Sequence, residues 1–101
     1  MFVTDCENGR VRVWSKKGSF QRDFKTKYAP AYIAATGDNH FLITSCISDA
    51  VMVYTLGGQL VHVFGGRGFD RGRFRGAYGI FVDDSGAVYV ADFGNKCVQV
   101  F

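Results

Sequence analysis

Short runs in which apolar and polar residues alternate recur along the whole chain. Val11 and Val13 alternate with Arg10 and Arg12, and Val98 and Val100 stand on either side of Gln99. Successive side chains of a strand point to opposite faces of a sheet, so a period of two is typical of strands with two distinct faces. Apolar residues nowhere recur at helical spacing over three turns. The pattern therefore predicts an all-β chain.

The strand-like runs belong to a repeat. Three copies begin at Asp5, Ser45 and Asp92, and each continues without a gap through a small polar residue and two valines to an aromatic residue. These matching positions are Asn8, Val11, Val13 and Trp14; Ser48, Val51, Val53 and Tyr54; and Asn95, Val98, Val100 and Phe101. The first two copies are offset by 40 residues and the last two by 47, and the additional residues lie between Phe64 and Ala77. A fixed period of this size is typical of stacked structural repeats.

Each unit contains pairs of apolar runs joined by turns. The stretch "IFVDDSGAVYVAD" surrounds an Asp-Asp-Ser-Gly turn, and "VRVWSKKGSFQRDF" and "VMVYTLGGQLVHVF" surround glycine-containing turns. These are hairpin signals. The unit is therefore predicted to be a four-stranded antiparallel sheet of the size of one β-propeller blade.

The last copy resembles an NHL repeat, whose pattern combines a glycine-rich loop with the motifs V-D, Y-V-A-D and N-x-R-V-Q-V-F. The matching residues are Phe64, Gly65, Gly72, Phe74, Gly79, Val82, Asp83, Gly86, Ala91, Asp92, Asn95, Val98, Gln99, Val100 and Phe101. Ala77 and Cys97 stand where the family has proline and arginine. The first copy keeps Asp5, Asn8 and Arg10; the middle copy keeps Pro30 but has Ser45, Ser48 and Ala50 at the positions of the family's aspartate, asparagine and arginine.

The resemblance implies a partial β-propeller of about two and a half blades. In the family's strand order, residues 1–27 are a partial blade (second to fourth strands plus connector), 28–74 a complete blade plus connector, and 75–101 a partial blade (first to third strands). Propellers close radially. We therefore expect an open fragment of a larger ring, an interpretation that the start of the chain within a strand favours, or a half-ring protomer that a second chain completes. Alone, it would expose blade faces and strand edges that invite association.

Antiparallel geometry sorts the charged residues between two ends of the sheets. Basic residues exceed acidic ones at the end expected to carry the connectors between blades, which we call the upper face: Lys25, Lys27, Arg67, Arg71, Arg73, Arg75 and Lys96 against Asp5, Glu7, Asp49, Asp70 and Asp92. The opposite end carries Lys16 and Lys17 against Asp38, Asp83 and Asp84. The net charge of +3 is thus unevenly placed.

The stretch "GRGFDRGRFRG" concentrates Arg67, Arg71, Arg73 and Arg75 in one glycine-rich loop. Guanidinium groups match phosphate geometry, and arginine with aromatic side chains can stack on bases. We therefore predict RNA or anion binding by these arginines together with Lys25, Lys27 and Lys96. The alternative is that the arginines only keep the loop soluble, and Phe74, part of the family pattern, is expected to pack between blades.

Other polar and aromatic positions have structural interpretations. Asp92 and Asn95 are expected to close their hairpin through hydrogen bonds from side chain to backbone, and Asp5 and Asn8 are the matching structural positions of the first copy. The repeat aromatics Trp14, Tyr54 and Phe101 are expected in the core. Asp83 and Asp84 indicate a turn, with weak calcium binding as the alternative. His40 and His62 lack a partner that would make a catalytic dyad.

Composition is that of a globular module, with 48% hydrophobic and 16% aromatic residues. No apolar run approaches the roughly 20 residues that cross a membrane, and a membrane partner is not expected. Cys6, Cys46 and Cys97 show neither disulfide nor zinc spacing, so no metal site and no cofactor are predicted. The absence of an N-glycosylation signal favours an intracellular setting, and we expect the cytoplasm.

Three classes of function remain. The leading one is a non-catalytic binding module that recruits RNA or protein substrates through the upper face, as in the NHL propellers of tripartite-motif ubiquitin ligases, whose ligase chemistry would lie in other domains. The second is a purely protein-binding propeller with an acidic partner. The third is an enzyme resembling metal-dependent NHL-like lyases, which requires ligands on the innermost strands, where only Asp83 stands at a strand end.

Overall fold

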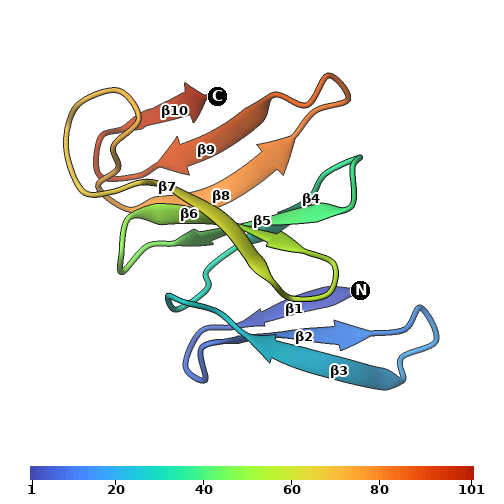
Figure 1. Cartoon of the computed structure of the whole chain (residues 1–101). Helices are drawn as coiled ribbons and strands as arrows, with labels where there is room; N and C mark the ends of the chain where they lie inside the picture. The colour runs from blue at the N-terminus through green and yellow to red at the C-terminus, as the bar shows by residue number, and fades with distance from the viewer.

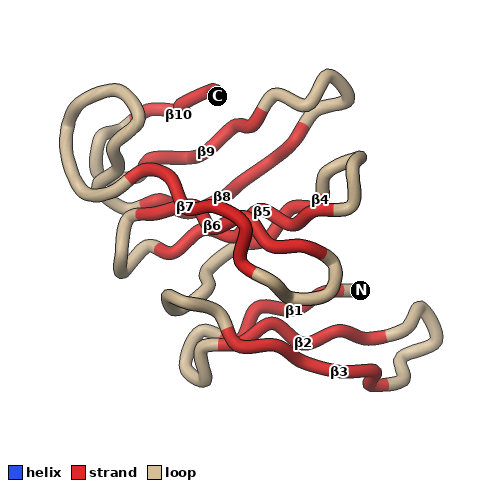
Figure 2. The backbone as a smooth tube through the Cα atoms, viewed as in Figure 1, coloured by secondary structure: helices blue, strands red, loops and turns tan.

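The computed structural model describes all 101 residues as ten β-strands in three antiparallel sheets, without a helix (Figures 1 and 2). The first sheet contains β1 (Phe2–Asp5), β2 (Arg10–Trp14) and β3 (Phe20–Lys25). The second contains β4 (Ile33–Ala35), β5 (His40–Ser45), β6 (Ala50–Thr55) and β7 (Leu60–Gly65). The third contains β8 (Ala77–Val82), β9 (Val88–Asp92) and β10 (Cys97–Val100). No helix is present that could span a membrane.

Within each sheet the strands follow their order in the sequence, and each pairs with its neighbour through a hairpin. The three sheets stack one after another (Figure 1). The all-β fold is confirmed, and the chain is a partial β-propeller. The repeat extends to fine detail, because β2 and β6 carry a register shift at equivalent positions, between Val13 and Trp14 and between Val53 and Tyr54.

Each sheet has two faces, named here by the neighbour that they meet. The front face is turned toward the preceding sheet, and the back face toward the following one. On the first sheet the front face carries five residues of β1 and β2: Val3, Asp5, Arg10, Arg12 and Trp14. The equivalent residues of the third sheet lie on β9 and β10 and directly after β10: Val90, Asp92, Cys97, Gln99 and Phe101. The alternation that predicted the strands therefore separates these two faces.

Two apolar clusters join the sheets. The first contains Val11 from the back of the first sheet and Phe41, Ile43, Met52 and Tyr54 from the second. The second contains Leu42, Val51, Phe74, Ala77 and Val90 and joins the second sheet to the third. Fully burying an aliphatic or aromatic side chain contributes about 1.5–3 kcal/mol, so these clusters supply most of the stability between sheets.

A threonine contact recurs beside each cluster. Thr4 Oγ1 donates a hydrogen bond to the Ala31 carbonyl oxygen at 2.9 Å, and Thr44 Oγ1 donates to the Tyr78 carbonyl oxygen at 2.7 Å. Both donors lie one sheet before their acceptors, at equivalent repeat positions. Successive sheets are thereby fixed in the same relative placement, which brings their connectors to one end.

The connectors between sheets and the β1–β2, β5–β6 and β9–β10 hairpins all emerge at the same end (Figure 1). Backbone hydrogen bonds link neighbours there, from Gly66 N to the Asp49 oxygen at 2.7 Å and from Phe93 N to the Gly76 oxygen at 3.0 Å. The remaining hairpin turns emerge at the opposite end. The upper face expected from antiparallel geometry is thus a single surface.

Candidate functional site

The connector between β7 and β8, residues 66–76, forms a broad loop at the upper face (Figure 1). We call it the arginine loop. It begins beside Gly65, where the backbone φ is 99° and an added Cβ would lie 2.6 Å from the Phe74 ring. Only glycine fits this position, because it tolerates the positive φ and leaves room for the ring.

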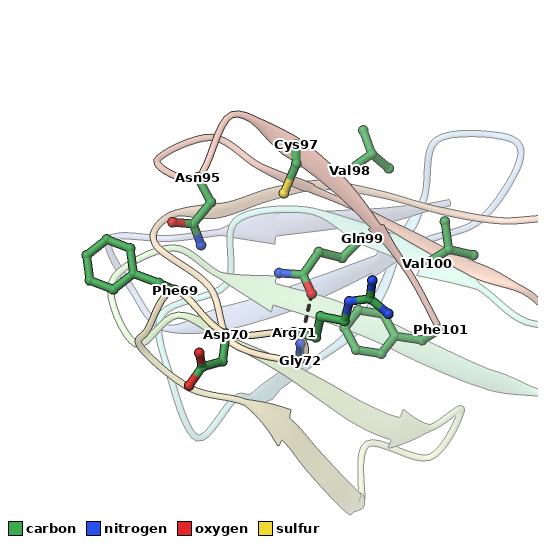
Figure 3. A pocket seen from close by; sticks show the side chains of 10 residues that line it. All are labelled: Phe69, Asp70, Arg71, Gly72, Asn95, Cys97, Val98, Gln99, Val100 and Phe101. Carbon is green, nitrogen blue, oxygen red and sulfur yellow. Dashed lines mark hydrogen bonds between the residues drawn. The ribbon is translucent and has the colours of Figure 1, made fainter.

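The loop is attached to the third sheet through its own backbone. Gly72 N donates to Gln99 Oε1 at 2.9 Å, which Figure 3 shows, and Gln99 Nε2 donates to the Arg73 carbonyl oxygen at 2.6 Å. Asn95 Nδ2 donates to the Gly68 carbonyl oxygen at 3.0 Å, and Arg75 N donates to Asp92 Oδ1 at 2.9 Å. We call Asp92, Asn95 and Gln99 the loop clamp. Because they bind main-chain atoms, the clamp fixes the path of the loop and leaves its side chains free.

Asp92 is the centre of the clamp and is almost fully buried. Its Oδ2 accepts hydrogen bonds from Asn95 Nδ2 at 2.7 Å and from Gln99 Nε2 at 3.0 Å. Burial is the largest single influence and raises the pKa of this carboxyl, but the hydrogen bonds from the Arg75 N–H, Asn95 and Gln99 together lower the pKa below its ordinary value. Asp92 is therefore held as a carboxylate.

Asp92 and Asn95 bind each other side chain to side chain, and their hydrogen bonds to backbone go to Arg75 and Gly68 of the arginine loop instead of closing their own hairpin as expected. Sequence reasoning treated both residues as local to their hairpin and gave Gln99 no role. Strand alternation places Gln99 on the same face of the sheet as Asp92, and this could have indicated from the sequence that Gln99 acts together with Asp92. A second missed residue is Gly94, because an added Cβ there would lie 1.9 Å from the Arg75 carbonyl oxygen.

The two phenylalanines of the loop have opposite placements. Phe74 is fully buried in the cluster between the second and third sheets, as its place in the repeat pattern predicted. Phe69 is 77% exposed, and the Arg75 guanidinium carbon lies 4.4 Å from its ring centroid. Phe74 therefore anchors the loop, whereas Phe69 and Arg75 form a stacked cationic–aromatic pair at its surface.

The four arginines of the loop are exposed. Arg67 Nε lies 4.0 Å from Asp49 Oδ2, while its side chain remains 80% exposed. Arg73 Nη1 reaches the Gly65 carbonyl oxygen at a long 3.4 Å. Neither contact neutralises the guanidinium group tightly, so the loop presents accessible positive charge.

Of the three lysines predicted to bind RNA or an anion, only Lys96 lies beside the arginine loop. Lys96 is exposed in the β9–β10 hairpin, whose Asn95 contacts the loop, so it adds to the same surface. Lys25 and Lys27 are exposed near and on the connector between β3 and β4, and the β5–β6 hairpin lies between that connector and the arginine loop (Figure 1). The Lys27 Nζ lies 5.6 Å from the Tyr28 ring centroid. The upper face therefore carries two separate basic groups.

A cavity of about 710 Å³ lies between the arginine loop and β10 (Figure 3). Its lining comes from Phe69, Asp70, Arg71, Gly72, Asn95, Cys97, Val98, Gln99, Val100 and Phe101. The cavity thus has an apolar wall along the strand and a polar wall along the loop, with Arg71 at its edge. This combination suits a group with a flat apolar face and an anionic end.

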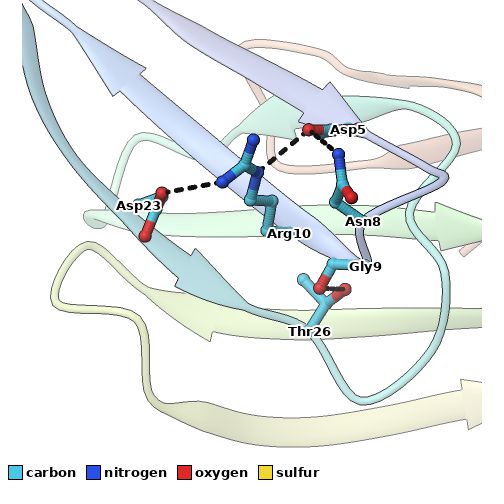
Figure 4. A network of polar contacts seen from close by, with 6 residues as sticks. All are labelled: Asp5, Asn8, Gly9, Arg10, Asp23 and Thr26. Atoms are coloured by element: carbon cyan, nitrogen blue, oxygen red, sulfur yellow. Dashed lines mark hydrogen bonds and ion pairs between the residues drawn. The ribbon is translucent and has the colours of Figure 1, made fainter.

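The first repeat contains an equivalent polar cluster (Figure 4). Asp5 Oδ2 accepts hydrogen bonds from Asn8 Nδ2 and from Arg10 Nε, both at 2.9 Å, and Arg10 Nη1 lies 3.3 Å from Asp23 Oδ2. The hydrogen bond from Asn8, and then that from Arg10, lower the pKa of the Asp5 carboxyl. In the middle repeat only a weaker contact remains, from Ser48 N to Ser45 Oγ at 3.4 Å.

The prediction that all three repeat aromatics lie in the core is correct for Tyr54 alone, which is 3% exposed. Phe101 is 44% exposed, although it packs on Phe64 and Phe74 with ring centroids 5.0 and 5.8 Å apart. Trp14 is half-buried on the front face of the first sheet. The difference arises because the first sheet's front face and the β10 edge have no covering strands.

The acidic turn at the opposite end is organised by Asp83. Its Oδ1 accepts hydrogen bonds from Ser85 N, Ser85 Oγ and Ala87 N, and its Oδ2 accepts one from the Tyr89 hydroxyl. These bonds, led by that from the Ser85 side chain, lower the pKa of Asp83. The residue therefore caps its turn. No group of three or more His, Cys, Asp or Glu side chains has the arrangement of a metal site.

Residues 74–101 match the NHL repeat family. No curated protein matches the sequence significantly. Among solved structures, selenomethionine-substituted virginiamycin B lyase from Staphylococcus aureus superposes with a TM-score of 0.71 over 99% of this chain, at 16% sequence identity. This chain corresponds to 36% of the lyase chain. The chain thus has a β-propeller fold in which residues 74–101 match an NHL repeat.

Proposed function

We propose that this chain is a non-catalytic binding module and that its arginine loop binds single-stranded RNA. The observation that carries the proposal is that the backbone of the loop is held by the third sheet while most of its side chains are exposed. Its backbone is held by Asp92, Asn95 and Gln99, while four arginines and Phe69 project into solvent. The backbone of such a loop loses little conformational entropy when it binds.

The chemistry of the exposed groups fits an RNA strand. Guanidinium groups bind phosphate oxygens in a bidentate manner, and an exposed aromatic ring offers a stacking surface for any base. Phe69, with Arg75 over one side of its ring, supplies such a surface. Arg71 beside the cavity and Lys96 on the adjacent hairpin extend the positive charge along the backbone path.

In the tripartite-motif context that the sequence resemblance implies, this module would recruit a substrate and other domains would carry out ubiquitin transfer. We place the activity in the cytoplasm, where the free thiols of Cys6, Cys46 and Cys97 stay reduced. The lyase alternative rests on the propeller fold that this chain shares with virginiamycin B lyase. It would need Asp83 as a ligand, and that carboxylate is engaged within its own turn.

The proposal is tested by fluorescence anisotropy with a labelled oligouridylate at increasing salt. Engagement of about five phosphates gives a slope of log affinity against log salt of roughly −3.5, because each single-strand phosphate contributes about −0.7. Each Arg→Gln substitution at Arg71 or Arg73 is expected to make the slope shallower by about 0.7. Lys16→Gln with Lys17→Gln, at the opposite end, is the matched control. A slope near zero contradicts the proposal.

A second arm separates RNA from an acidic protein partner. Phe69→Ala is expected to weaken RNA binding by about 1–3 kcal/mol, the usual value of one stacked base, and to leave binding of an oligoglutamate peptide unchanged. Tighter binding of the peptide than of RNA, with no effect of Phe69→Ala on either, would favour the protein-binding alternative.

A further inference from the structure

The front face of the first sheet has no covering sheet, and one of its side chains has an unpaired buried atom. Arg12 Nε is shielded from solvent and has no hydrogen-bond partner. The guanidinium carbon of Arg12 lies 4.4 Å from the Phe20 ring centroid and 5.7 Å from that of Trp14. The side chain thus lies against both rings, which touch each other edge-on, and its Nε has no acceptor within the chain. A buried N–H without a partner is costly, so this position calls for one.

The repeat shows what occupies the equivalent position. Arg12 corresponds to Gln99, and Asp5 and Asn8 correspond to Asp92 and Asn95. In the third sheet these three residues bind the backbone of the arginine loop, which arrives from the sheet before it. The first sheet therefore carries the same clamp positions on its front face, without a loop.

The middle repeat supplies an internal comparison. There the clamp positions are Ser45, Ser48 and Met52, and the connector that arrives from the preceding sheet, residues 26–32, is shorter than the arginine loop. Within this chain, clamp residues accompany the long glycine-rich connector and are absent with the short one. The clamp positions of the first sheet therefore indicate a long glycine-rich connector.

The first sheet has Arg12 where the third sheet has Gln99, and this difference changes which connector can bind. Gln99 both donates and accepts, whereas a guanidinium group only donates. Arg10 contacts both nearby carboxylates, Asp5 and Asp23, whereas Arg12 makes none of the ion pairs in the structure. Asp23 lies opposite Arg12 in the β2–β3 register but is engaged by Arg10, so the guanidinium group of Arg12 has no ion-pair partner, and an acceptor of negative charge would supply one.

We propose that the front face of the first sheet binds a glycine-rich connector of a preceding β-sheet, with Asp5 and Asn8 holding its backbone and Arg12 pairing with a carboxylate of that connector. The pairing residue stands where Gly72 stands in the arginine loop. Trp14 lies beneath the docked connector, as Phe101 lies against Phe74 in the third repeat.

The test uses the complete chain and synthetic peptides that copy residues 66–87, the connector and first strand of the third repeat. One peptide carries Gly72→Asp and a matched one carries Gly72→Asn. Both residues tolerate a positive φ, and the site is open to a Cβ. Trp14 is the single tryptophan of the chain and the peptides contain none, so its fluorescence reports binding at this face.

The expected result is that the Gly72→Asp peptide binds about tenfold more tightly than the Gly72→Asn peptide, the size of one charge-assisted contact. The preference should disappear in Arg12→Gln and persist in Lys17→Gln, which removes the same charge from an exposed turn. Equal affinities of the two peptides for the unmodified chain, a preference retained in Arg12→Gln, or no change in Trp14 fluorescence with either peptide would overturn the proposal.

Discussion

At the scale of single residues, repeat position and environment together determine what a side chain does. Asp5 and Asp92 are equivalent, yet Asp92 is almost fully buried under a loop while the side chain of Asp5 is 25% exposed beside Arg10. Asp49, at 4% exposure, accepts a hydrogen bond at 2.6 Å from Gly76 N, at the end of the arginine loop. The buried carboxylates of the upper face, Asp49 and Asp92, therefore hold main-chain N–H groups in place.

The lowered pKa of Asp92 predicts acid sensitivity. A carboxyl whose pKa is lower in the folded state stabilises the fold fully above its ordinary pKa of 3.8, and this stabilisation is lost as the pH falls below that value. The free energy of unfolding, measured by urea denaturation between pH 7 and pH 3, should fall less steeply in Asp92→Asn. Asp84→Asn, at an exposed carboxyl without a hydrogen bond, should retain the full slope.

Gly94 gives a steric prediction. Gly94→Ala places a methyl group 1.9 Å from the Arg75 carbonyl oxygen, so the hairpin and loop must separate. We expect a loss of about 1–3 kcal/mol in the free energy of unfolding and faster hydrogen exchange at the Gly72 amide. Gly37→Ala, with no atom within 4 Å of the new Cβ, is the control and should change stability by less than about 0.5 kcal/mol. Equal effects of the two substitutions would contradict this account.

At the scale of elements, the arginine loop joins the second and third sheets as well as presenting charge. Phe74 is inserted between the sheets, the clamp binds the middle of the loop from the third sheet, and Asp49 of the β5–β6 hairpin binds Gly66 N and Gly76 N at its two ends. The β9–β10 hairpin and the loop therefore form one unit, although they are separated in the sequence by two strands.

The two phenylalanines of the loop allow a matched comparison. Phe74→Ala should cost about 3–5 kcal/mol in the free energy of unfolding because it leaves a cavity between sheets. Phe69→Ala should change it by less than about 0.5 kcal/mol, since that ring is 77% exposed. Thermal and urea denaturation measure both, and Phe74→Leu should give an intermediate loss if the alanine variant does not fold.

Strand alternation and the repeat made the sheets predictable, because both can be recognised from the order of the residues alone. The single upper face also followed, since antiparallel pairing fixes which turns share an end. The clamp did not follow, because it joins Gln99 to Gly72 and depends on how two sheets stack. The exposure of Trp14 and Phe101 was likewise not predictable, because it depends on which neighbours cover their sheets.

At the scale of the whole molecule, the third sheet exposes a back face that is apolar. Phe81, Phe93, Val98 and Val100 are between 58% and 76% exposed, and the β10 edge has no neighbouring strand. Val98 and Val100 correspond to Val51 and Val53, which pack against the third sheet. The exposed face thus has the chemistry of an interface between sheets, which further blades or a second copy of the chain would fit.

This surface predicts concentration-dependent association of the isolated chain. Val98→Lys with Val100→Lys should raise the concentration of half-association at least tenfold, because two apolar side chains are removed and the β10 edge gains charge. Sedimentation velocity measures the change. Val61→Lys, at a 56% exposed residue of β7, is the control and should behave as the unmodified chain does. An unchanged association in the double variant would show that another surface mediates it.

The main-chain attachment of the arginine loop has a consequence for redesign. Because Gly68, Gly72, Arg73 and Arg75 are held through peptide groups, residues 67, 69, 70, 71 and 73 can be randomised while the scaffold stays intact. A display library built on these five positions would keep one loop geometry and vary only its chemistry, much as antibody loops do on their framework. Selection from such a library would turn this module into a source of new affinity reagents.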